Sequence, residues 1–178
     1  MKEARLSIEE YFDLIEKKNK ELAWAEVIDA SNQIISILRP KVTRGDATEL
    51  EQRYFIGALN SLTVTYGIIG EYQKAVKCAK RALRHSHAAN LTPVEVYLGY
   101  SILARAQKSA KMFDDAHRSL IKGIVSFLTP KDTEFLRCTM MDLSELYKRM
   151  DKTESSESIQ QVAKDIQASK RIARRSAK

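Results

Sequence analysis

The sequence contains little glycine, proline or cysteine. Its 178 residues include 6 Gly, 3 Pro and 2 Cys. Because glycine and proline supply most tight turns, this scarcity argues against β folds with many turns and favours long helices. The two cysteines, Cys78 and Cys138, lie far apart in the sequence and have no metal-ligand residues beside them. They therefore argue against a disulfide scaffold and against a metal site, and they favour a reducing compartment.

Long apolar runs are missing as well. No run approaches the roughly 20 residues that a membrane-spanning helix needs, and the charged start of the chain, Met1 to Leu6, does not resemble a signal peptide. We therefore expect a cytoplasmic protein that does not insert into a membrane. The formal net charge of +7 gives a moderate bias toward acidic partners.

Motifs that carry out chemistry are also missing. None of the glycines forms a GxxxxGK or GxGxxG phosphate-binding loop, and Gly99–Ser101 lacks the second glycine of a nucleophile elbow. The carboxylate pairs Glu9–Glu10 and Asp114–Asp115 lie at expected helix starts, where negative charge offsets exposed amide groups. His85 and His87 are two residues apart and do not share a helical face. The sequence therefore predicts a protein that is not an enzyme and that holds no cofactor and no metal.

The most regular part of the chain runs from Leu59 to Leu83. Large apolar residues recur at helical spacing in its first half, and alanines recur at helical spacing in its second half. Gly70, between the halves, suits the left-handed conformation that is common just past a helix end. The pattern predicts two antiparallel helices joined by a turn. The positions that carry it are Leu59, Leu62, Tyr66, Gly70, Tyr72, Ala75, Ala79, Ala82 and Leu83.

This stretch resembles one tetratricopeptide repeat, a helix-turn-helix unit of about 34 residues. Tyr72 and Ala75 fall where the second helix of such a unit approaches the first closely. The resemblance implies an all-α fold in which helical hairpins stack as a right-handed solenoid with a concave groove. Large side chains of one helix would then lie over the alanines of its neighbour.

A second repeat follows the first. Lys111, Phe113 and Ala116 keep the spacing of the turn, aromatic and alanine positions, at an offset of 41 residues. This offset exceeds the usual period by about two helical turns. Longer repeats of this kind resemble those of kinesin light chains and of Rap-type receptors for bacterial peptide pheromones.

The whole chain, 1–178, is predicted to form a single tetratricopeptide-like domain of about eight antiparallel helices. A degenerate first hairpin is expected over 7–40, with a capping box at Ser7 and Glu10 and with Pro40 ending its second helix. A loop over 41–46 follows. The strongest repeat takes 46–87 and the second clear repeat takes 92–128. A last hairpin or capping helix, 129–175, carries a basic tail.

The resemblance also implies where a ligand binds. In the repeat family, ligands contact exposed positions on the first helix of each hairpin, and here these positions make the concave groove partly basic. The implied partner is a protein segment or peptide of acidic character. Arg105 and Lys108 lie one turn apart and could both face the groove, and the equally weighted alternative is that they are ordinary solvated charges. The groove positions are Asn60, Val64, Ile68, Ser101, Arg105, Lys108, Met141, Glu145 and Lys148.

The C-terminal tail concentrates positive charge. Its basic residues include Lys170, Arg171, Arg174 and Arg175. Cations near a helix C-terminus are stabilising in themselves, and an electrostatic contact with nucleic acid or an acidic surface is the alternative. Three functions stay open at this point. A protein-binding scaffold or adaptor is favoured, a peptide-responsive regulator related to Rap-type receptors comes second, and nucleic-acid binding through the tail comes third. An end hairpin could also form a homodimer interface.

Overall fold

The computed structural model describes residues 6–89, 91–126, 133–161 and 163–164, and within these ranges every regular element is a helix. Residues 153–161 and 163–164 are helical. The all-α class expected from the sequence is confirmed. The helices with defined bounds are α1 (Ile8–Lys20), α2 (Trp24–Arg44), α3 (Glu49–Ile68), α4 (Tyr72–Ala88), α5 (Pro93–Ser109), α6 (Phe113–Ser126) and α7 (Thr133–Arg149).

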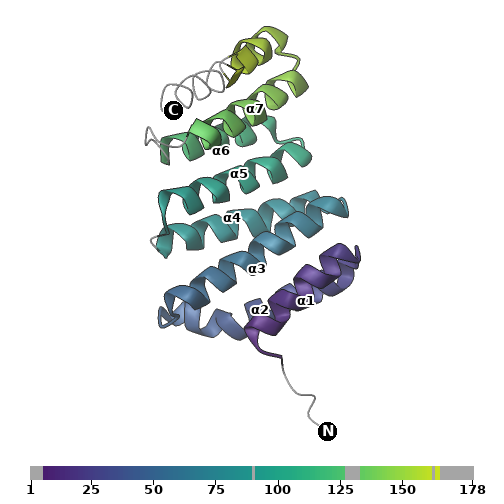
Figure 1. Cartoon of the computed structure of the whole chain (residues 1–178), viewed down its shortest axis with the longest axis vertical. Coiled ribbons are helices and arrows are strands. Elements are labelled where there is room, and N and C mark those ends of the chain that lie inside the picture. Colours follow the sequence, from purple (N-terminus) through teal and green to yellow (C-terminus); the bar gives the residue numbers. More distant parts are fainter. Residues whose placement is uncertain (1–5, 90, 127–132, 162, 165–178) are drawn as a thin grey trace, which may run out of the picture. The chain divides into compact units, whose positions relative to one another are not determined.

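The helices belong to two compact units, and the boundary between them lies between Thr92 and Pro93. The first unit holds α1 to α4, and the second begins with α5. Within each unit, helices that follow one another in sequence contact each other, and the pairs α1–α2, α3–α4 and α5–α6 are antiparallel hairpins (Figure 1). The chain is therefore a helical-hairpin repeat protein. A single domain and a right-handed superhelix stay predictions.

Local signals explain where several helices begin and turn. Ser7 caps α1 and forms a capping box with Glu10, as the sequence predicts, and Thr48 forms a second capping box with Glu51 at the start of α3. Gly70 has a φ angle of +82° in the turn between α3 and α4. This angle lies in the left-handed region, where glycine has no steric penalty. The turn thus fixes the hairpin geometry of the strongest repeat.

The expectation that Pro40 ends the second helix is wrong. Helix α2 continues through Pro40 to Arg44 and ends at Gly45, whose φ angle is +79°. A proline inside a helix costs about 3 kcal/mol because it removes a hydrogen bond and crowds the preceding turn. Leu38 is buried and Val42 packs against the same core, so tertiary packing on both sides of Pro40 offsets this cost. The expected loop over 41–46 is correspondingly shorter.

The core of the first unit lies between its helices and includes much of the predicted repeat pattern. Leu59, Leu62 and Ala82 pack in one apolar cluster with Phe55 and Ile34. Outside this cluster, the pattern positions Ala75, Ala79 and Leu83 are also buried. The small alanines of α4 let this helix approach α3 closely, which is the arrangement that the alternation of large and small residues predicts.

Two aromatic pattern positions lie closer to the surface. Tyr66 is half-buried, and the ammonium group of Lys74 lies 5.7 Å from the centre of its ring. Tyr72 is 42% exposed, and its position at the close approach of the two helices stays a prediction. Tyr72 is the first residue of α4, and helical side chains point toward the N-terminus of their helix.

The second unit has its own apolar cluster. Ala116 is fully buried between Ala104, Leu120 and Leu146, and Phe113 packs against the cluster from its edge. Lys111 occupies the turn position before α6 with a φ angle of 60°, the same backbone conformation as Gly70 in the first unit. The chain therefore repeats the turn geometry without repeating the glycine.

Candidate partner-binding surface

One face of α3 carries exposed apolar residues in the first unit. Val64 and Ile68 are each 54% exposed and lie one helical turn apart. Asn60, one turn before Val64, is half-buried. In the described part of the chain its side-chain oxygen is buried and has no hydrogen-bond partner. The predicted groove positions of α3 are thus brought together on one side of the helix.

Helix α1 covers the N-terminal half of the same face. The rings of Phe12 and Tyr54 lie 5.2 Å apart between their centres, and a Cβ atom on Gly57 would come within 3.2 Å of the Phe12 ring. Burial and a hydrogen bond to the Glu9 side chain raise the pKa of the Tyr54 hydroxyl. The contact is therefore close, and the glycine makes room for it.

The covered and uncovered parts of this face form one row. Steps of three and four residues keep side chains on one side of a helix. We use the name α3 stripe for the row Tyr54, Gly57, Ser61, Val64 and Ile68. Its first two positions lie against Phe12 of α1, and its last two are exposed. The stripe therefore continues beyond the part that the chain itself covers.

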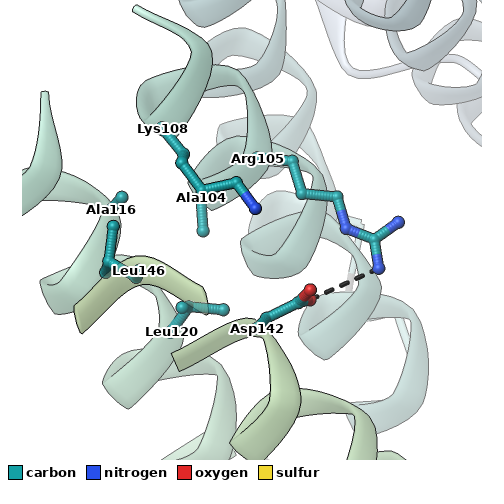
Figure 2. A pocket seen from close by; sticks show the side chains of 7 residues that line it. All are labelled: Ala104, Arg105, Lys108, Ala116, Leu120, Asp142 and Leu146. Carbon is teal, nitrogen blue, oxygen red and sulfur yellow. Dashed lines mark hydrogen bonds and ion pairs between the residues drawn. The ribbon is translucent and has the colours of Figure 1, made fainter. Parts of the chain in front are cut away.

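A small pocket lies between α5, α6 and α7 in the second unit (Figure 2). Its volume is only about 10 Å³. Arg105 and Asp142 face each other across it, and Lys108 lines it from α5. The apolar lining comes from Ala104, Ala116, Leu120 and Leu146.

The charges around this pocket are of both signs. Arg105 donates a hydrogen bond to the Asp142 carboxylate, with 3.3 Å between nitrogen and oxygen. A hydrogen bond from Arg149 lowers the pKa of Glu145, and the positive charge of Lys108 lowers it further. The basic side chains that were predicted to meet an acidic ligand therefore lie near acidic groups of α7.

The remaining groove positions of the second unit differ in exposure. Ser101 is only 8% exposed, so the expectation that it is an exposed ligand contact is wrong. It lies on α5 between buried Tyr97 and Ala104, one turn away on each side, and shares their inward face. Met141, Glu145 and Lys148 are exposed on α7.

Asp142 is not among the predicted groove positions, although it lies next to Met141 and three residues before Glu145. Its position within one helical turn of predicted groove positions could have indicated that it lies at the same surface. The basic tail residues Lys170, Arg171, Arg174 and Arg175 lie outside the described residues. Among the residues that are described, no helix is long and apolar enough to cross a membrane.

Comparisons with known proteins place few constraints on this chain. No family model matches it, and no curated protein matches it. Among solved structures, the chain is similar to the crystal structure of BtubC (BKLC) from P. vanneervenii. The sequence identity is 17% and the TM-score is 0.40, and the similarity covers 92% of this chain and 91% of that chain. At this level of similarity, the description of the fold rests on the helices of the chain itself.

Proposed function

We propose that this protein is a non-enzymatic helical-repeat scaffold that binds an amphipathic helix of a partner protein along the α3 stripe. The observation that carries the proposal is the exposure of Val64 and Ile68, two aliphatic side chains on one face of a helix that packs against α2 and α4. Single exposed apolar residues are common on protein surfaces. Two neighbours that extend an internal helix-helix contact are a better candidate for a docking surface.

The way in which α1 covers the stripe suggests the occupant. Helix α1 is itself amphipathic, with apolar residues toward the core and charged residues toward solvent. It places Phe12 over Gly57 and against Tyr54. A partner helix with an apolar side chain over Ser61, between Tyr54 and Val64, would continue the same packing. Recognition of this kind uses apolar anchors at helical spacing.

The pocket of the second unit is a separate candidate contact, for an acidic group of a ligand. Arg105 is 65% exposed although it pairs with Asp142. An exposed ion pair is weak because water screens it, so an acidic group of a ligand can compete for Arg105. This second contact agrees with the acidic ligand that the sequence predicts. Binding of a helix to the α3 stripe does not depend on it.

Site-specific photo-crosslinking tests the proposal. A benzophenone amino acid is placed at Val64, at Ile68 or at Lys80, an exposed residue of α4 that serves as the control position. We expect one partner to crosslink from Val64 and from Ile68 and not from Lys80. In a chain that carries Val64→Asp, the crosslink from Ile68 should fall at least about tenfold, because burying a charged group against an apolar partner costs more than 1.4 kcal/mol.

The test can reject the proposal clearly. Equal crosslinking from Lys80 indicates non-specific adhesion. Crosslinking from Ile68 that survives Val64→Asp shows that the partner does not use the stripe. Because Val64 and Lys80 are both exposed, circular dichroism of the variants should match that of the wild type and exclude unfolding as the cause.

A further inference from the structure

Three arginines with no acidic partner lie together on α2 and α4 of the first unit. Arg39 and Arg84 are exposed, and Arg81 is half-buried. Arg39 and Arg84 are both close enough to Arg81 to make its positive charge electrostatically unfavourable. Within the described residues, none of the three guanidinium groups has an ion pair, whereas Lys41 pairs with Glu51 and Arg44 pairs with Asp46. The carboxylates of Glu51 and Asp46 are thus paired with other cations.

Arg81 is held in place by an aromatic ring. Its guanidinium carbon lies 5.1 Å from the centre of the Phe55 ring, at the distance of a cation–π contact. Burial lowers the pKa of Arg81, and the neighbouring charges of Arg39 and Arg84 lower it further. A partly buried cation among like charges is costly unless an anion lies nearby. An anionic ligand near Arg81 would reduce this electrostatic cost.

A cavity lies beside the Phe55 ring that Arg81 contacts. Its volume is about 210 Å³. Its lining residues are Val42, Gly45, Gln52, Phe55, His85 and Ala88. An apolar cavity of about 150 Å³ is enough to bind benzene, so this one has room for a ring of that size.

The cavity and the arginines share structural elements. Val42 follows Arg39 by one turn on α2, and His85 follows Arg81 by one turn on α4. The Phe55 ring contacts the Arg81 guanidinium and also lines the cavity. The His85 ring lies edge-on to the Phe55 ring, with 4.9 Å between the ring centres. A single small ligand can therefore contact both parts.

We propose that α2 and α4 form a binding site for a small aromatic phosphate monoester. Arg39, Arg81 and Arg84 bind the phosphate, and the cavity next to Phe55 binds the ring. A phosphate monoester carries close to two negative charges at neutral pH and presents several oxygen acceptors. Guanidinium groups bind such oxygens in pairs, and clusters of arginines are a recurring means of phosphate recognition. A carboxylate carries one charge and would leave more of the cluster unpaired.

This site is separate from the α3 stripe, because it uses α2, α4 and the buried side of α3. The test therefore does not depend on the proposed partner helix. Phenyl phosphate is titrated into the full-length, ¹⁵N-labelled protein, and amide shifts are followed by NMR. Inorganic phosphate tests the role of the ring, and benzoate tests the role of the second charge. We expect phenyl phosphate to bind at least about tenfold more tightly than either, with shifts that centre on α2 and α4.

Matched variants locate the phosphate contact. The double variant Arg39→Gln/Arg84→Gln removes two exposed side chains and should keep the fold while weakening phenyl phosphate binding at least about tenfold. The control Arg118→Gln removes an exposed arginine that pairs with Asp115 in the second unit. It should bind as the wild type does.

Four results would overturn the proposal. The first is no binding at millimolar phenyl phosphate, and the second is an affinity for inorganic phosphate or benzoate equal to that for phenyl phosphate. The third is unchanged binding of phenyl phosphate by the double variant. The fourth is a loss of binding in Arg118→Gln equal to that in the double variant. The last result would show a response to overall charge and not to a site.

Discussion

The Arg105 guanidinium on α5 lies 3.3 Å from the Asp142 carboxylate on α7. The two helices do not follow each other in sequence, so the ion pair joins the second unit across α6. The Asp142 side chain is 22% exposed and the Arg105 side chain is 65% exposed, so water reaches both. Exposed ion pairs contribute about 0–1 kcal/mol because solvent screens them and because ordering two side chains costs entropy. The pair therefore orients Arg105 more than it stabilises the unit.

A double-mutant cycle on this pair should give a small coupling energy. We expect Arg105→Gln and Asp142→Asn each to lower the free energy of unfolding by less than about 1 kcal/mol, with a coupling energy below about 1 kcal/mol. Urea denaturation of the two single variants and the double variant measures these values. A coupling energy above 2 kcal/mol would show that the pair is an essential bridge, and an acidic ligand could not then displace Asp142.

Overfilling the contact between α3 and α4 should destabilise the first unit. Ala75 is buried where α4 packs, so Ala75→Trp forces the helices apart and should cost about 1–3 kcal/mol or more. Leu62→Arg, which buries an unpaired charge, should be at least as damaging. Gln73→Trp places the same ring at an exposed position and is the control. An Ala75→Trp protein that melts at the same temperature as Gln73→Trp would contradict the packing described here.

Two glycines should respond to substitution in opposite directions. A Cβ atom on Gly123 would lie 3.1 Å from the Tyr100 Cβ atom, so Gly123→Val should lower the free energy of unfolding by about 1–3 kcal/mol. Gly67 lies in α3 with no atom within 4 Å of an added Cβ atom. Gly67→Ala should raise the free energy of unfolding by about 0.5–1 kcal/mol through helix propensity. Thermal unfolding followed by circular dichroism measures both. Destabilisation by Gly67→Ala would indicate a contact that the structure lacks.

His85 should make stability depend on pH. Burial lowers its pKa in the folded state, and the charges of Arg81 and Arg84 lower it further. The unfolded chain therefore binds a proton more readily than the folded chain. The contribution to stability is complete above the unfolded pKa of about 6.5 and is lost as the pH falls from there toward the folded value.

The variant His85→Phe isolates this effect, because it keeps a ring against Phe55 and cannot titrate in this range. We expect the urea midpoint of the wild type to fall more steeply than that of the variant between pH 7.5 and pH 5.5. Parallel pH profiles would show that the folded state accepts the proton on His85 as readily as the unfolded state does.

Features that depend on local sequence were predictable. The hairpin of α3 and α4 follows from the spacing of Leu59 and Leu62, the alanines of α4 and the glycine at 70. The end of α2 was not predictable, because the local effect of Pro40 is opposed by packing of Leu38 and Val42 against other helices. A prediction that considers only the residues next to a proline does not include this packing energy.

The candidate site was predictable only in part, for a similar reason. The periodicity of α3 places Asn60, Val64 and Ile68 near one another, but exposure depends on where α1 ends its contact at Gly57. The pairing of Arg105 with Asp142 joins residues 37 positions apart. The grouping of Arg39 with Arg81 likewise requires α2 and α4 to be placed on the same core. Helical periodicity describes single helices and does not specify such contacts.

The proline within α2 has a consequence for how the protein exchanges its amide hydrogens. Pro40 offers no N–H to the carbonyl of Ser36, so the turn that follows is tied to the rest of α2 by one bond fewer. We expect amides 41–44 to exchange with deuterium faster than those near Ile34 and Ile35, through openings that leave the remainder of the unit folded. Val42 lines the cavity, so part of the cavity wall belongs to this readily opened segment. Slower exchange of these few amides would then report that the cavity is occupied.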